Sequence, residues 1–243
     1  MNDNICLRAL WKEAFSDTDD FLDIFFRSAY SPDRCLYLTE GEALTAALYW
    51  FDCRWGSEKV AYLYAIATAK AFRGQGLCRR LMAHAHHLLK SQGYAGAVLV
   101  PENESLAEMY QKMGYMPLCS RDGFSVSPAE PVCLRELSAE EYRLARRQYL
   151  PENGILQEGE NLSFLAELTR FYRGEDFLLA AAKENDALFC PELLGNKAAA
   201  PGITAALGCK QGQFYAPGGN LPFAMWHGLN TDAIPAYFGH AFE

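Results

Sequence analysis

The chain has 243 residues, half of them apolar and 13% aromatic, which is enough for one large core or two compact ones. Its formal net charge of −8 argues against non-specific nucleic-acid binding, because phosphates attract clusters of Lys and Arg. No apolar run approaches the roughly 18 residues of a membrane span, and the N-terminal stretch lacks the charge and apolar pattern of a signal peptide.

The eight cysteines indicate neither a disulfide framework nor a metal site. None of them forms a C-x-x-C pair. Zinc sites need such close ligand pairs, so we expect no metal and interpret the thiols as reduced and mostly buried. The cysteines therefore predict a cytoplasmic protein, and the negative charge and the missing apolar span predict that neither nucleic acid nor a membrane is its partner.

Helices and strands are expected to alternate up to residue 114. Apolar residues at helical spacing predict helices over 5–15, 19–29, 77–92 and 103–112. Apolar or alternating runs predict strands over 35–39, 44–51, 60–68 and 95–100. The strand over 60–68 is apolar on both faces, which is typical of the middle of a covered sheet. The alternation indicates an α/β fold.

The pattern changes after a proline-bearing stretch at 128–131, and we place a boundary there, between domains over 1–128 and 129–243. In the second domain we expect helices over 138–149, 161–173 and 201–207. Strands are expected over 132–137, 177–182, 187–194, 213–216, 223–229 and 237–242. This order loosely repeats that of the first domain, without a repeat at the level of residues.

A glycine-bearing loop joins the central strand to the helix over 77–92. The first N–H groups of a helix lack partners, and the helix dipole adds positive potential, so this junction suits a pyrophosphate. Gly74 and Gly76 leave the backbone open to close approach, and Arg73, Arg79 and Arg80 add positive charge. The spacings of the P-loop and of the dinucleotide fingerprint are both absent.

Two motifs in this order resemble those of the GNAT acyltransferases. Arg73-Gly74-Gln75-Gly76-Leu77-Cys78 follows the family's Q/R-x-x-G-x-G/A loop, with Cys78 in the final small position. The stretch from Asn103 to Tyr115 is similar to N-x-x-A-x-x-x-Y-x-x-x-G-F/Y, with Ala107 one place later than the usual alanine. The resemblance implies a mixed central sheet flanked by helices, and acetyl-CoA as co-substrate. It covers 34–128 well, and the second domain looks like a smaller, degenerate GNAT-like α+β lobe.

The resemblance also assigns roles to residues. The backbone of Ile66, Ala67 and Thr68 would pair with the pantetheine arm of the coenzyme. The pyrophosphate would be held by Arg73, Gly74, Gln75, Gly76, Leu77 and Cys78, with Asn103 as a further cofactor contact. Tyr110 would be the general acid that protonates the leaving thiolate, a role that suits an un-ionised phenol at neutral pH.

The general base has no obvious candidate. Tyr62 and Val98 occupy strand positions where many members of this family carry a glutamate. Glu102 and Glu104 flank Asn103, but first-turn acids usually serve the helix dipole. The carboxylate of Glu243, at the side chain or the terminus, is an alternative. A water chain or an amine of low pKa would also serve, and the base stays unassigned.

Several other residues could in principle bind a metal or a substrate, but we interpret them as structural. His84, His86 and His87 are expected on the flank and solvent face of their helix, since they have no acidic or cysteine partner at helical spacing. Tyr62 and Tyr64 could face a substrate groove, although core packing explains them more simply. Trp226 and His227 are expected to be ordinary strand residues.

We therefore expect an N-acetyltransferase that moves an acetyl group from acetyl-CoA to a primary amine of a small molecule or peptide by direct attack. The acidic net charge suits a cationic amine. Two alternatives stay open. One is a non-catalytic CoA-binding sensor or scaffold. The other is a tandem aminoacyltransferase of the cell-wall type, for which the negative charge is unfavourable, because the donors are RNA-linked.

Overall fold

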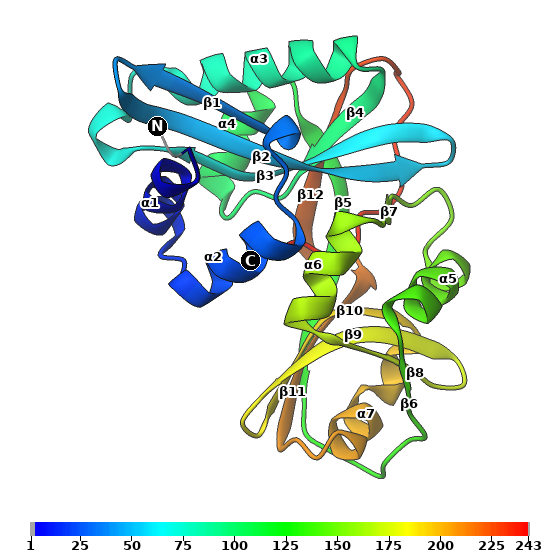
Figure 1. Ribbon diagram of the computed structural model, residues 1–243. Coiled ribbons are helices and arrows are strands. Elements are labelled where there is room, and N and C mark those ends of the chain that lie inside the picture. The colour runs from blue at the N-terminus through cyan, green and yellow to red at the C-terminus, as the bar shows by residue number, and fades with distance from the viewer. Residues whose placement is uncertain (1–2, 243) are drawn as a thin grey trace. The chain divides into compact units, whose positions relative to one another are not determined.

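The structure, a computed structural model, describes residues 3–242, which form two compact units (Figure 1). Within the described residues, unit 1 comprises 3–116 and Trp226–Ile234, and unit 2 comprises Pro117–Met225 and 235–242. Each unit therefore contains two separate stretches of the chain. Glu243, considered above as a base, lies outside the described residues.

Unit 1 contains the eight elements expected up to residue 114. Its helices are α1 (Asp3–Phe15), α2 (Asp19–Ser28), α3 (Leu77–Ser91) and α4 (Glu104–Gln111). Its strands are β1 (Cys35–Glu40), β2 (Ala43–Trp55), β3 (Glu58–Thr68) and β4 (Tyr94–Leu99). Short 3-10 turns at Pro32–Arg34 and Lys70–Phe72 precede β1 and α3. The spacing of apolar residues thus predicted this half of the chain to within a few residues at the ends.

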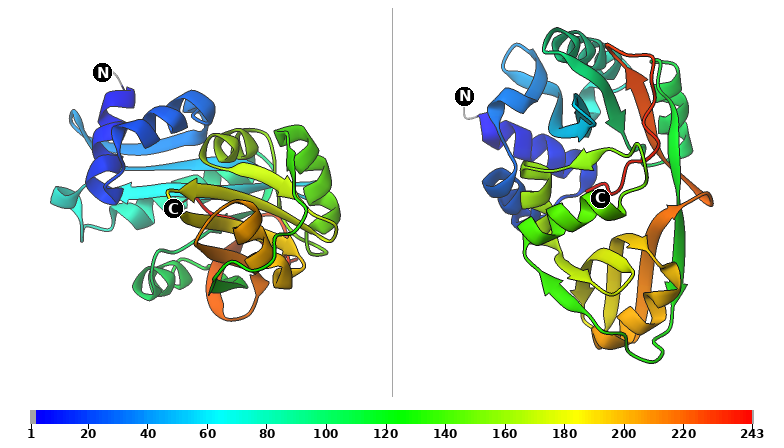
Figure 2. Two further views of the ribbon diagram at one scale, coloured as in Figure 1. Left: turned by 90° about the horizontal axis from the view of Figure 1, so that it is seen from below. Right: turned by 90° about the vertical axis from the view of Figure 1, so that its right-hand side faces the viewer.

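The sheet of unit 1 is mixed. Its order is β1-β2-β3-β4, with antiparallel pairs up to β3 and a parallel β3–β4 pair. The end of β12 (Leu221–Gly228) lies beside β4 (Figure 2). Helices α1 and α2 cover one face of the sheet and α3 covers the other (Figure 1). Coverage on both faces explains why the apolar middle of each central strand, 46–51 in β2 and 60–63 in β3, is buried on both sides.

The strands of unit 2 follow one another in the order β5-β11-β10-β9-β8-β6 of one 12-stranded sheet, and among their described pairs only β10 and β11 are parallel. Its helices are α5 (Ala139–Tyr149), α6 (Glu160–Leu168) and α7 (Ala200–Ala206). Its strands before the hairpin are β5 (Met116–Val126), β6 (Arg135–Leu137), β7 (Leu156–Gln157) and β8 (Arg170–Arg173). The later strands are β9 (Phe177–Glu184), β10 (Ala187–Gly195), β11 (Gln211–Gly218) and β12. A mixed α/β fold with helices flanking central sheets is therefore confirmed.

Three predictions for the second half were wrong in detail. The helix expected over 161–173 ends at Leu168, and Arg170–Arg173 forms β8 instead, because pairing with β9 prevails over an apolar spacing that mimics a helix. The strand expected over 132–137 is limited to Arg135–Leu137. No strand forms over 237–242, where hydrogen bonds from Gln157 and Ile155 hold the backbone.

Candidate functional site

The loop before α3 leaves the start of this helix open. Gly76 is the N-cap residue, with φ of +76°, and it offers no side-chain cap; the first turn contains no acidic residue. A Cβ at Gly74 or Gly76 would meet no atom within 4 Å, so the backbone there is accessible. Buried Leu77 anchors the helix beneath the loop. The first N–H groups of α3 are thus presented to an anion.

Three arginines lie in the loop and in the first turn of this helix, and the neutral Gln75 lies between them in the sequence. Gln75, Arg73, Arg79 and Arg80 are all exposed. The Nε atom of Arg73 donates a hydrogen bond of 3.1 Å to the carbonyl of Thr68, which ties the loop to the end of β3. The structure therefore brings the predicted strand residues and the predicted loop residues together.

The pairing between strands β3 and β4 ends halfway along β3. Their parallel ladder runs from Lys59↔Tyr94 to Tyr62↔Val98 and ends there. The ladder between β3 and β2 continues to Thr68↔Ala46. Beyond Tyr62, β4 therefore offers β3 no hydrogen-bond partner. A substrate with amide groups can pair with a strand that has lost its neighbour in this way.

A bulge lies in β3 just before the predicted cofactor residues. Ala65 has φ of +50°, and the register against β2 shifts between Ala47 and Tyr49. A positive φ is uncommon for a residue other than glycine, and bulges often re-aim a strand next to a functional site. The Nε1 atom of Trp11 donates a 3.1 Å hydrogen bond to the Ala65 carbonyl and fixes α1 at this bend. Ile66 to Thr68 follow the bulge.

The Tyr110 hydroxyl lies within electrostatic range of the Cys78 thiol, which is in the first turn of α3. Tyr110, in the last turn of α4, is only 5% exposed. Burial and then the nearby Cys78 thiol raise the pKa of its hydroxyl, so it remains protonated at neutral pH. Burial likewise raises the pKa of Cys78, which disfavours a nucleophilic thiolate.

Asn103 serves the start of α4. Its Oδ1 atom accepts a 3.0 Å hydrogen bond from the backbone N–H of Leu106, an N-cap arrangement. Its side chain is exposed, and within residues 3–242 no hydrogen bond joins it to the loop from Arg73 to Cys78. Glu102 and Glu104, on either side of it, are also exposed.

One of the three adjacent histidines has a different environment from the one expected. His84 and His87 are exposed, as predicted, but the Nε2 atom of His86 lies 2.9 Å from the Tyr115 hydroxyl. Its ring also stacks on His227, with centroids 4.3 Å apart. The helix repeat alone did not distinguish these positions, because His227 arrives from a distant part of the chain.

A half-buried carboxylate was missed in the sequence. Asp17 lies in the turn between α1 and α2, and burial raises its pKa. Burial, then Tyr62 and then the charge of Asp17 raise the pKa of the Tyr64 hydroxyl on β3, so the carboxylate lies within electrostatic range of that hydroxyl. The sequence holds three aspartates within four residues here, and only the fold separates Asp17 from the others.

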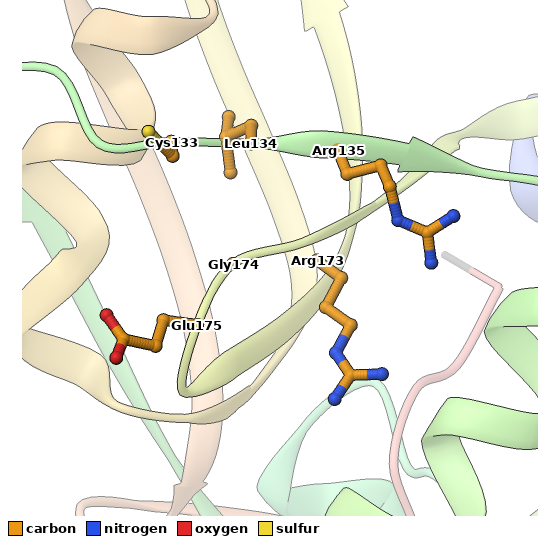
Figure 3. Close-up of a pocket in the computed structure, with 6 residues that line it drawn as sticks. All are labelled: Cys133, Leu134, Arg135, Arg173, Gly174 and Glu175. Carbon is orange, nitrogen blue, oxygen red and sulfur yellow. The ribbon is translucent and has the colours of Figure 1, made fainter.

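Unit 2 has a cavity of its own. A cavity of about 400 Å³ in unit 2 is lined by Cys133, Leu134, Arg135, Arg173, Gly174 and Glu175, none of them a predicted site residue (Figure 3). Among residues 3–242, no three His, Cys, Asp or Glu side chains gather as a metal site requires. None of the helices in this range combines the length and apolar character needed to cross a membrane.

Comparisons with known proteins agree with this geometry. A family model described as an acetyltransferase (GNAT) domain matches residues 6–118. A GCN5-related N-acetyltransferase from Kribbella flavida is 16% identical, with a TM-score of 0.70 over 93% of this chain and 68% of its own. One from Anabaena variabilis is 14% identical, with a TM-score of 0.73 over 95% and 71%.

A tandem GNAT protein from the clavulanic acid biosynthesis pathway is 10% identical, with a TM-score of 0.59 over 96% of this chain and 97% of its own. These low identities establish a shared fold only. No curated protein matches the chain. The match of an acetyltransferase (GNAT) domain model to residues 6–118 and the shared fold of these neighbours agree with the resemblance seen in the motifs.

Proposed function

We propose that the chain is an acetyl-CoA-dependent N-acetyltransferase acting on a primary amine of a small molecule or peptide. The observation that carries the proposal is the open helix start at Gly76, which follows the part of β3 that has no partner in β4. The helix start can accept an anion, and the unpaired part of β3 can accept an extended chain of amide groups. Coenzyme A carries both of these groups.

The coenzyme would bind from the loop toward the strand. Backbone N–H groups from Gly74 to Cys78 would hold the pyrophosphate, helped by Arg73. The backbone of Ile66 to Thr68 would pair with the pantetheine arm, and one of its N–H groups would polarise the thioester carbonyl. Because Asn103 already caps α4 through Oδ1, its amide group is the part left to contact the coenzyme.

Transfer would proceed in one displacement. The amine nitrogen forms a bond to the thioester carbon, and the carbon–sulfur bond then breaks. Tyr110 gives its proton to the departing sulfur, while the amine loses a proton to a base. The raised pKa of Tyr110 keeps that proton on the hydroxyl until the thiolate forms. No covalent enzyme intermediate is needed.

Asp17 is our candidate for the group that receives the amine. Asp19 and Asp23, its neighbours in the sequence, form ion pairs with Lys12 and Arg8. No ion pair to Asp17 occurs within residues 3–242. Its carboxylate lies between α1 and α2 and within electrostatic range of the Tyr64 hydroxyl on β3. A cationic amine would supply the missing counter-charge, and the carboxylate could then accept a proton from it.

The test is turnover by Tyr110→Phe. We expect free thiol to be released from acetyl-CoA in the presence of a suitable primary amine. Loss of the general acid should lower kcat by about 10²-fold or more, with little change in acetyl-CoA affinity. Equal kcat values would remove Tyr110 from the mechanism. A protein that binds acetyl-CoA but acetylates none of a broad amine panel would instead be the CoA-binding sensor or scaffold considered above.

A further inference from the structure

The stretch Trp226–Ile234 belongs to unit 1, although it follows most of unit 2 in the sequence. Trp226 is 1% exposed and packs on Gly96 of β4, where a Cβ would overlap the indole ring. The next residues add hydrogen bonds: two backbone N–H groups donate to the carbonyl of Ala95, at 2.8 and 3.0 Å. This stretch is therefore a fixed part of the unit that carries Tyr110.

His227 contacts the turn that follows the Tyr110 helix. Its Nδ1 atom lies 2.9 Å from the Gly114 carbonyl. A carbonyl oxygen only accepts, so Nδ1 must carry a proton and donate it. Gly114 has φ of +91°, and a Cβ there would lie 3.0 Å from the His227 ring. Glycine at this position therefore allows the positive φ of the turn and leaves room for the His227 ring.

A second imidazole completes the contact. The His86 ring on α3 stacks on His227 at an angle of 18° and lies 2.9 Å, through Nε2, from the Tyr115 hydroxyl. Burial, and then the charge of His227, lower the pKa of His86 to about 4, so it is neutral at neutral pH. The His227 ring also packs against Tyr115, with centroids 5.2 Å apart.

This cluster is joined directly to the candidate general acid. The Tyr115 N–H donates a 3.1 Å hydrogen bond to the Tyr110 carbonyl. Their rings meet edge to face, with centroids 5.9 Å apart. Any shift of Tyr115 or of the turn at Gly114 would therefore move Tyr110.

We propose that His227 is a positioning residue for Tyr110: it holds the turn at Gly114 and, with His86, fixes Tyr115, so that the Tyr110 hydroxyl stays aimed at the departing sulfur. This inference rests on the function proposed above. It gives the returning stretch Trp226–Ile234 a role in transfer as well as in packing.

The experiment compares His227→Phe with His227→Asn. Phenylalanine keeps an aromatic ring but cannot donate to the Gly114 carbonyl, whereas the Asn amide can donate from nearly the position of Nδ1. We expect the Phe variant to lose about tenfold or more in kcat, since small displacements of a catalytic group are costly, with acetyl-CoA affinity unchanged. The Asn variant should recover most of the loss.

A double-mutant cycle distinguishes positioning from general loss of structure. If His227 acts through Tyr110, His227→Phe should lower kcat in the wild type but cause no further loss in a Tyr110→Phe background. Gly114→Ala should resemble His227→Phe. Gly93→Ala is its matched control, because Gly93 also follows a helix with positive φ, +79°, but has open space around it.

Each outcome is decisive. The same fractional loss in both backgrounds, an unchanged kcat for His227→Phe, or an equal effect of Gly93→Ala would overturn the inference. Wild-type protein that shows no turnover with any amine would overturn the proposed function itself, and the positioning role with it. Active wild type with unaffected His227 variants would overturn the positioning role alone.

Discussion

Asp17 is the residue on which amine recognition is expected to depend. Asp17→Asn keeps the size of the side chain and removes its charge, so kcat/KM for a cationic amine should fall by about 10²-fold, while acetyl-CoA binding stays unchanged. Because burial raises the pKa of Asp17, the wild-type activity should decline on the acid side at a higher pH than an ordinary aspartate would give. Asp20→Asn, an exposed neighbour, is the control. Equal effects of the two variants would contradict the assignment.

A buried ion pair in unit 2 gives a second prediction at this scale. Arg146 and Glu192 are 2% and 0% exposed at their side chains, with Nε and Oε2 2.7 Å apart. The Tyr142 and Tyr237 hydroxyls also donate to the carboxylate of Glu192. Burial alone would raise the pKa of Glu192, but attraction and hydrogen bonds from Arg146 prevail and hold it well below its ordinary value.

Glu192→Gln should therefore destabilise the protein by about 3–5 kcal/mol at neutral pH, since it leaves Arg146 buried without its partner. Because the pKa of Glu192 is lower in the folded than in the unfolded protein, the carboxylate stabilises the fold at pH values above its ordinary pKa of 4.5. This stabilisation is lost as the pH falls from 4.5 through the pKa of the folded protein. The difference between wild type and variant should thus shrink below pH 4.5, as urea titrations at several pH values would show. Asp186→Asn, which breaks an exposed pair with Lys210, should cost about 0–1 kcal/mol.

At the scale of elements, β4 depends on a residue from the other end of the chain. Gly96 of β4 has no room for a Cβ beside Trp226 and the His227 carbonyl. Gly96→Ala should cost about 1–3 kcal/mol through overpacking, and it should shift the tryptophan fluorescence. Gly219→Ala, with nothing within 4 Å of the added Cβ, should be nearly neutral. If Gly96→Ala unfolds at the same urea concentration as the wild type, Trp226 does not pack as described.

Elements with strong local signals were predictable. The helix stripe of α3, with Leu81 and Leu89 fully buried, and the capping box of Ser138 and Glu141 at α5 both depend on residues a few positions apart. Strand β8 was missed because Phe171 stands three residues after Leu168, a helical spacing, while its actual partner lies in β9. Local patterns carry no information about such pairing.

At the scale of the whole molecule, the family and the loop at Gly76 could be predicted, because a contiguous motif carries them. The contribution of Trp226–Ile234 to unit 1 could not, since more than a hundred residues separate it from Met116. His86 and His227 were accordingly given ordinary roles. Asp17 escaped notice for the same reason: its burial depends on how α1 and α2 lie against the sheet. The interpretation of the second half as a degenerate GNAT-like lobe stays a prediction.

The central claim is that acetyl-CoA binds at the loop before α3, and isothermal titration of the whole chain tests it most directly. Wild-type protein should bind acetyl-CoA saturably with one site per chain. Gly76→Asp should abolish binding, because it places a carboxylate where the pyrophosphate would lie. Gly41→Asp is the matched control, with positive φ of +57° and open space, and it should bind like the wild type. No binding by the wild type, or undiminished binding by Gly76→Asp, would contradict the account.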